Sequence, residues 1–186
     1  MEAVLFYHIA AEFYGNQSKA GLIGIKNCAN GIKESIEAML SRNKELKSII
    51  RTHVIPLMHD MREMIRRSVD VNEKDRCLWE VWCLHRIERS EGLVDNFSGC
   101  EKTIKEAIAI MERVFQQGAA TYLVYGHFLN NLGYTYEQTS RPNDACEYFR
   151  KAIAAYGKAE DIDDDLRAKW VSNSIQFLKD ANRQIQ

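Results

Sequence analysis

The sequence predicts an all-α protein built from antiparallel helical hairpins. Apolar side chains recur every three or four residues along most of the chain, which is the spacing of one helical face. The 186 residues include only two prolines and ten glycines, so few positions interrupt a helix. No run of alternating β-branched residues predicts a strand.

The first 69 residues are expected to form a long N-terminal helical hairpin. A helix over residues 2–14 precedes a second helix, for which Ser18 is a favourable N-cap. Asn30 and Gly31 could end the second helix early, but its apolar stripe keeps its phase, so we expect helix to about Leu40. The stripe has the spacing of a helix–helix seam and consists of Leu22, Ile25, Ala29, Ile32, Ile36 and Met39.

The third helix, which Asn43 is expected to cap, carries Pro56 in its middle. Proline inside a helix costs about 3 kcal/mol and usually kinks it. The apolar stripe nevertheless stays in phase from Ile50 to Met61, which predicts one kinked helix and not two. At roughly 25 residues this helix would be about 38 Å long. Met58 lies off the stripe and is expected to be partly exposed.

A polar loop over residues 70–75 is the candidate boundary inside the chain. The part that follows, residues 75–186, is predicted to contain helical hairpins and a C-terminal capping helix. Its first helix carries Trp79 and Trp82, and its second ends near Gly118. We expect this part and the N-terminal hairpin to form one continuous domain.

The clearest hairpin covers residues 126–157. Two amphipathic runs flank a short polar break, and each places small and large residues on one face. Gly133 and Ala145 would let two helix backbones approach closely, while Tyr136 and Phe149 would fill the space beside them. Aspartates then precede a last helix, where they suit the positive end of the helix dipole.

This hairpin resembles one tetratricopeptide repeat (TPR), a helical unit of about 34 residues. The matching positions are Leu129, Leu132, Gly133, Tyr136, Ala145, Phe149 and Ala152. The usual closing proline is absent, and Gly157 stands near its place. The resemblance implies a right-handed stack of hairpins that acts as a protein-interaction module and not as an enzyme.

In that family, side chains of the first helix often line a concave groove that holds a partner peptide. Carried over to this chain, the groove residues are His127, Asn130, Asn131, Tyr134 and Glu137. They would bind an extended or helical peptide by hydrogen bonds and burial. The alternative interpretation is that these five residues form a solvated helix face.

A second hypothesis is binding of RNA or another anionic ligand by the third helix. Between Arg42 and Arg67 the chain has seven Lys or Arg against three Asp or Glu, which makes this segment basic. The candidate contacts are Lys47, Arg51, Arg62, Arg66 and Arg67. A third hypothesis is a dimerisation module that uses the seams of the second and third helices.

Other chemistry has little support in the sequence. The cysteines and histidines lack the spacing of a zinc site, and no glycine-rich loop would cradle a phosphate. Cys83 and His85 point to different helix faces, so a thiolate nucleophile with its base is unsupported. We therefore expect no metal, no cofactor and no catalysis. The five cysteines suggest reduced core thiols in a cytoplasmic or nuclear protein, and no stretch is apolar enough to span a membrane.

Overall fold

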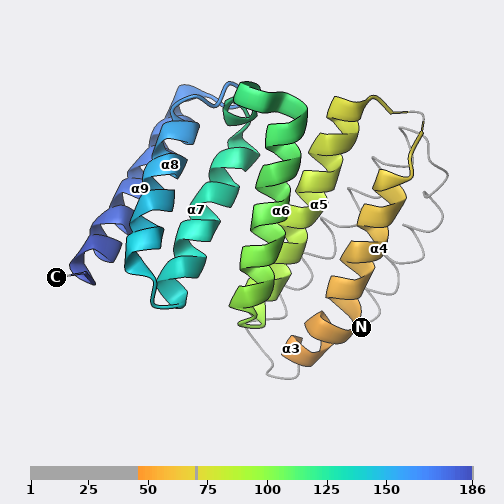
Figure 1. Cartoon of the computed structure of the whole chain (residues 1–186), viewed down its shortest axis with the longest axis horizontal. Helices are drawn as coiled ribbons and strands as arrows, with labels where there is room; N and C mark the ends of the chain where they lie inside the picture. The colour runs from red at the N-terminus through yellow and green to blue at the C-terminus, as the bar shows by residue number, and fades with distance from the viewer. Residues whose placement is uncertain (1–45, 70, 186) are drawn as a thin grey trace. The chain divides into compact units, whose positions relative to one another are not determined.

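The computed structural model describes residues 46–69 and 71–185, and these residues form helices joined by short turns, with no strand among them (Figure 1). The all-α prediction is therefore confirmed. The expected helices at 2–14 and 18–40, the cap at Asn43 and the thiol of Cys28 lie outside the described residues.

The chain divides into two compact units, Met1–Asn96 and Phe97–Gln186. The described part of the first unit contains α3 (Leu46–Ile49), the π-helix η1 (Ile50–Val54), α4 (Ile55–Arg66) and α5 (Glu73–Leu93). The second contains α6 (Phe97–Phe115), the 3-10 helix η2 (Gln116–Thr121), α7 (Leu123–Gln138), α8 (Pro142–Tyr156) and α9 (Asp164–Arg183). Helix α5 packs against α4, so both belong to the first unit. The boundary expected at residues 70–75 stays a prediction.

In the first unit the helical backbone passes through Pro56 without a break. Proline has no N–H to donate, and its ring clashes with the carbonyl four residues earlier. A π-helical turn precedes it, in which the Ile55 N–H bonds to the Ile50 carbonyl five residues back. The predicted continuous helix is confirmed from residue 46 onward. The expectation for Met58 is wrong, because its side chain is 1% exposed and its carbonyl accepts the Cys83 thiol at 3.4 Å.

The second unit is built on the α7–α8 hairpin, which confirms the hairpin predicted over residues 126–157. The close approach comes from glycines of α7 facing rings of α8. A Cβ added at Gly133 would lie 2.7 Å from the Phe149 ring, and one at Gly126 would lie 2.5 Å from the Tyr156 ring. Both rings are fully buried, so each fills the space that a glycine leaves.

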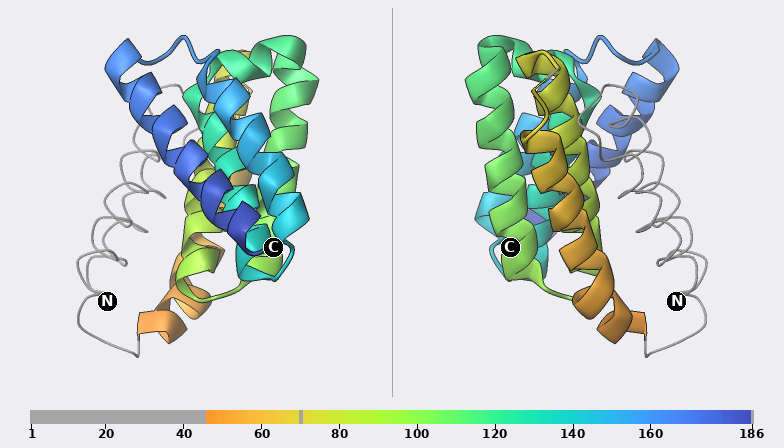
Figure 2. Two further views of the ribbon diagram at one scale, coloured as in Figure 1. Left: turned by 90° about the vertical axis from the view of Figure 1, so that its left-hand side faces the viewer. Right: turned by 90° about the vertical axis from the view of Figure 1, so that its right-hand side faces the viewer.

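Helix α9 follows after a short acidic segment. The Asp163 carboxylate accepts the Leu166 N–H at 2.7 Å and caps the helix. Asp164 and Asp165 occupy the first turn, as predicted for the positive end of the helix dipole. The helix packs mainly on α8 and also touches α7. It faces the viewer in the left panel of Figure 2.

Candidate functional site

Helix α9 lies against the same face of α7 that the sequence suggested for a groove. The His127 and Trp170 rings are 4.5 Å apart. Further along, the Ser174 hydroxyl donates to the Asn130 side-chain oxygen at 2.8 Å, and the Gln184 amide donates to Glu137 at 2.9 Å. Residue numbers rise together on both helices, so α7 and α9 run parallel.

The five predicted groove residues therefore have different surroundings. Asn130 is 9% exposed beneath Ser174, and His127 is half-buried between α8 and α9. Glu137 contributes to the contact with α9, and Asn131 is half-buried on α7. Tyr134 is the exception, because 46% of it is exposed. Whether these residues bind a partner stays a prediction.

A second exposed ring, that of Phe177, comes from α9. Phe177 is 38% exposed and stacks on Phe149, with ring centroids 5.7 Å apart. Phe149 in turn lies against Gly133, the neighbour of Tyr134 in sequence. We call Tyr134 and Phe177 the aromatic pair. The sequence analysis did not single out Phe177. The small Ser174 one turn earlier, which contacts Asn130 of α7, was a signal in the sequence that α9 could approach this face.

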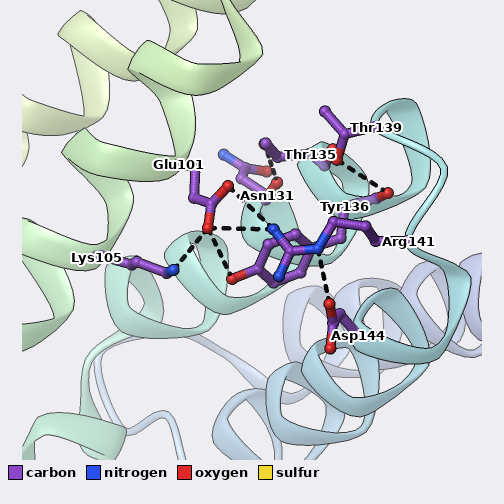
Figure 3. A network of polar contacts seen from close by, with 8 residues as sticks. All are labelled: Glu101, Lys105, Asn131, Thr135, Tyr136, Thr139, Arg141 and Asp144. Atoms are coloured by element: carbon purple, nitrogen blue, oxygen red, sulfur yellow. Dashed lines mark hydrogen bonds and ion pairs between the residues drawn. The ribbon is translucent and has the colours of Figure 1, made fainter.

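A polar network joins α6 to the turn between α7 and α8 (Figure 3). Glu101 on α6 accepts from Lys105 at 2.6 Å and pairs with Arg141 at 3.2 Å. The Arg141 guanidinium lies 4.0 Å above the Tyr136 ring and also bonds to Asp144 at 2.8 Å. Two carboxylates and two cations balance within this network, so it offers no surplus charge to a ligand.

The electrostatics of the network follow from these contacts. The hydrogen bond from Lys105 is the main cause that lowers the pKa of Glu101, and the charge of Arg141 adds to it while burial opposes it. Burial raises the pKa of Tyr136, so its hydroxyl keeps its proton and donates to Glu101 at 3.3 Å. Both features are those of a connection between helices and not of a general acid or base.

The basic residues of the alternative hypothesis do not form one free surface. Arg62 is 6% exposed and donates to Glu80 on α5 at 2.8 and 3.0 Å. Arg66 pairs with Glu63 at 3.0 Å, and Arg51 donates to the Val94 carbonyl at 2.7 Å. The remaining two residues, Lys47 and Arg67, are exposed. Lys47 forms an ion pair with Asp95.

Other candidate sites in the described residues are small or inert. A shallow pocket of about 210 Å³ lies between η2, α7 and α8, below the 300 Å³ or more that is usual for small-molecule sites. No group of three His, Cys, Asp or Glu in residues 46–69 and 71–185 is placed to hold a metal ion. Burial raises the pKa of Cys83 to about 12, so this thiol is a poor nucleophile. None of the described helices is long and apolar enough to cross a membrane.

Comparison with known proteins adds little to these observations. No family model matches the sequence, and no curated protein does either. Among solved structures, a match is described as the crystal structure of MamA protein. It is 15% identical, the match covers 98% of this chain and 92% of that chain, and the TM-score is 0.34. A likeness at this TM-score carries no weight for function, so the proposals below rest on the residues of this chain.

Proposed function

We propose that this chain is a non-catalytic adaptor that binds an apolar segment of a partner protein at the aromatic pair. The observation that carries the proposal is the exposure of Tyr134 and Phe177, 46% and 38%, on two parallel helices, with Phe177 stacked on the buried Phe149. Large aromatic side chains are the usual anchors of protein interfaces. Exposed apolar patches on a protein surface mark interaction sites.

The surroundings of the pair suit a peptide or an amphipathic helix. Glu137 and Gln184, already bonded to each other, provide polar groups beside the rings, as expected at the rim of an interface. The predicted groove is narrowed by α9, because Asn130 and His127 already contact it. We therefore assign the contact with the partner to Tyr134 and Phe177, and the support of α9 to Asn130 and His127.

The test is affinity capture from a lysate, followed by mass spectrometry, with the wild-type chain and a Tyr134→Ala/Phe177→Ala variant. We expect a specific set of proteins to be lost or reduced at least tenfold with the variant. Val69→Ala is the matched control, because Val69 is an exposed apolar side chain in the first unit, 76% exposed. Circular dichroism must show equal helicity for the variants. Equal capture by all three chains would defeat the assignment.

Two other functions remain as proposals with less support. Anion binding by the third helix is weakened by the burial of Arg62 against Glu80. The seam of residues 22–39 lies outside the described residues. In the seam of the third helix, Ile50, Val54 and Met61 are already buried in the single chain. Light scattering over a concentration series distinguishes a dimer from an adaptor that stays monomeric.

A further inference from the structure

The pocket between η2, α7 and α8 has a floor of small and apolar side chains. Leu129 of α7 and Ala155 of α8 line it and are only 5% and 4% exposed. Ala120 of η2 and Ala154 of α8 also line it, and their short side chains leave the hollow open. Its volume of about 210 Å³ is small for a metabolite or a cofactor. A single apolar side chain of another protein is the group that such a hollow can bury.

Two lysines stand before and after the alanines along the chain. Lys151, Ala154 and Ala155 belong to one face of α8, and Lys158 follows two residues after the helix ends at Tyr156. Both lysines line the pocket. Because a helix rises about 1.5 Å per residue, seven residues separate the two lysines by about 10 Å. The pocket is therefore an apolar hollow with a cation on either side of it.

The carboxylates close to the pocket are engaged in other contacts. Glu147 pairs with Lys151 at 2.6 Å across one turn of α8, and both are about half exposed, so this pair is weak and can be exchanged. Glu112 of α6 accepts the Tyr125 hydroxyl at 2.7 Å, and burial raises the pKa of Tyr125, so the donor keeps its proton. In the part of the chain that the structure describes, no carboxylate pairs with the Lys158 ammonium. The pocket can therefore offer positive charge to a ligand.

The walls of the pocket are held in place by hydrogen bonds. The Glu160 N–H, just after the pocket lysines, donates to the Thr121 carbonyl at the end of η2 at 2.8 Å. The Asp161 carboxylate accepts the Leu123 N–H at the start of α7 at 2.7 Å. These bonds join all three elements that form the pocket. A site that is fixed before binding loses less conformational freedom when a ligand arrives.

We propose that this pocket binds an acidic amphipathic helix of a partner protein. One apolar side chain of that helix fills the hollow over Leu129 and Ala155, and a carboxylate one turn to either side of it meets Lys151 or Lys158. Two carboxylates seven residues apart on a helix are also separated by about 10 Å, which matches the lysines. Burial supplies affinity, and the lysines favour acidic over basic segments.

This site is separate from the aromatic pair, because its lining residues come from η2, α7 and α8 and not from α9. The inference therefore does not rest on the proposed function. It extends that function, since a chain with both sites would hold two partner segments on one hairpin.

The probe is an alanine-based helical peptide of about 16 residues, long enough to form helix in part on its own. It carries one leucine, a glutamate four residues before the leucine and another three residues after it. The peptide is titrated into the ¹⁵N-labelled 186-residue chain, and binding is followed by NMR at the backbone amides of Leu129 and Ala155. We expect both amides to shift along one saturating curve by about 1 mM peptide.

Two matched peptides separate the apolar from the charged contribution. In one the leucine is replaced by alanine, which removes the side chain that fills the hollow. In the other both glutamates are replaced by glutamine, which removes the ion pairs but keeps the shape. Each should bind at least fivefold more weakly than the first peptide. Equal affinity of the alanine peptide would show that the lysines attract any anion and that the hollow is not used.

Two variants of the chain test the pocket from the other side. Ala154 is exposed, so Ala154→Leu keeps the helix while it fills the hollow, and we expect binding to fall at least tenfold. Lys151→Gln/Lys158→Gln should weaken binding about fivefold, as expected for two exposed ion pairs. Lys102→Gln/Lys169→Gln is the control, because it changes the net charge equally at exposed lysines outside the pocket. Circular dichroism must show equal helicity for all variants.

The proposal is overturned if the first peptide leaves the Leu129 and Ala155 amides unmoved. It is also overturned if Ala154→Leu binds as well as the wild type, or if the control variant loses as much affinity as the pocket lysine variant. If the peptide binds here while Tyr134→Ala/Phe177→Ala captures the same proteins as the wild type, only the function proposed for the aromatic pair is lost.

Discussion

At the scale of single residues, two glycines of α7 set how closely α8 approaches. Gly126 and Gly133 are seven residues apart and so lie on one helical face, where each accepts an aromatic ring of α8. Glycine within a helix costs about 0.5–1 kcal/mol relative to alanine. The chain tolerates that cost twice in α7 because the close approach buries Phe149 and Tyr156 completely.

We predict that Gly133→Ala destabilises the protein although alanine is the better helix former. The new Cβ would lie 2.7 Å from the Phe149 ring, and forcing apart a packed core costs about 1–3 kcal/mol. After the gain in helix propensity, we expect a loss of about 1–2 kcal/mol. Gly118→Ala is the control, with nothing within 4 Å of its added Cβ, and should be neutral or slightly stabilising. Urea unfolding measures both; equal stability of the two variants would contradict the packing argument.

At the scale of the elements, helix identity could be predicted from the sequence, but the surroundings of individual side chains could not. The period of the apolar residues predicted the α7–α8 hairpin and the passage of helix through Pro56, because periodicity reports which face is buried. It misplaced Met58 because the phase of a stripe does not reveal a π-helical turn next to it. It also missed that α9 covers Asn130, since such a contact depends on tertiary packing across 44 residues.

We predict that the link from α6 to the α7–α8 turn weakens in acid. The bonds from Lys105 and Arg141 lower the pKa of Glu101 below its ordinary value of 4.5. A carboxylate with a lowered pKa stabilises the fold above its unfolded-state pKa, and this contribution is lost as the pH falls through the folded-state value. Because the Glu101 pairs lie near the surface, we expect the contribution to be under about 1 kcal/mol.

Urea unfolding of the wild type and of Glu101→Gln at pH 7 and at pH values below 4.5 measures this effect. The variant should be less stable at pH 7, and the difference from the wild type should shrink in acid. Glu147→Gln serves as the control, because the Glu147–Lys151 pair lies within one helix and joins no other element. A difference that stays constant with pH would show that the Glu101 charge contributes nothing.

At the scale of the whole molecule, the charge is nearly balanced and much of it is used internally. The formal net charge is -1, so no long-range field draws the chain towards polyanions. In the basic segment that suggested RNA binding, Arg62 is buried in an ion pair with Glu80 and is not available to a ligand. Sequence composition includes charged side chains that are buried in the fold, whereas a ligand can contact only the charged side chains at the surface.

We predict that the 186-residue chain does not retain single-stranded RNA at moderate salt. Binding to a polyanion requires several cations that can displace its counterions, and the described part of this segment offers Arg67 and the surface-paired Lys47, Arg51 and Arg66. The measurement is retention of a fluorescent polyuridine on the immobilised protein at about 150 mM salt, where exposed charges are screened beyond about 8 Å. Arg66→Glu/Arg67→Glu should give the same low signal. Strong retention of RNA that this double variant removes would restore the anionic-ligand hypothesis in place of the adaptor. It would mean that these four surface cations suffice to bind RNA although the net charge of the chain opposes binding.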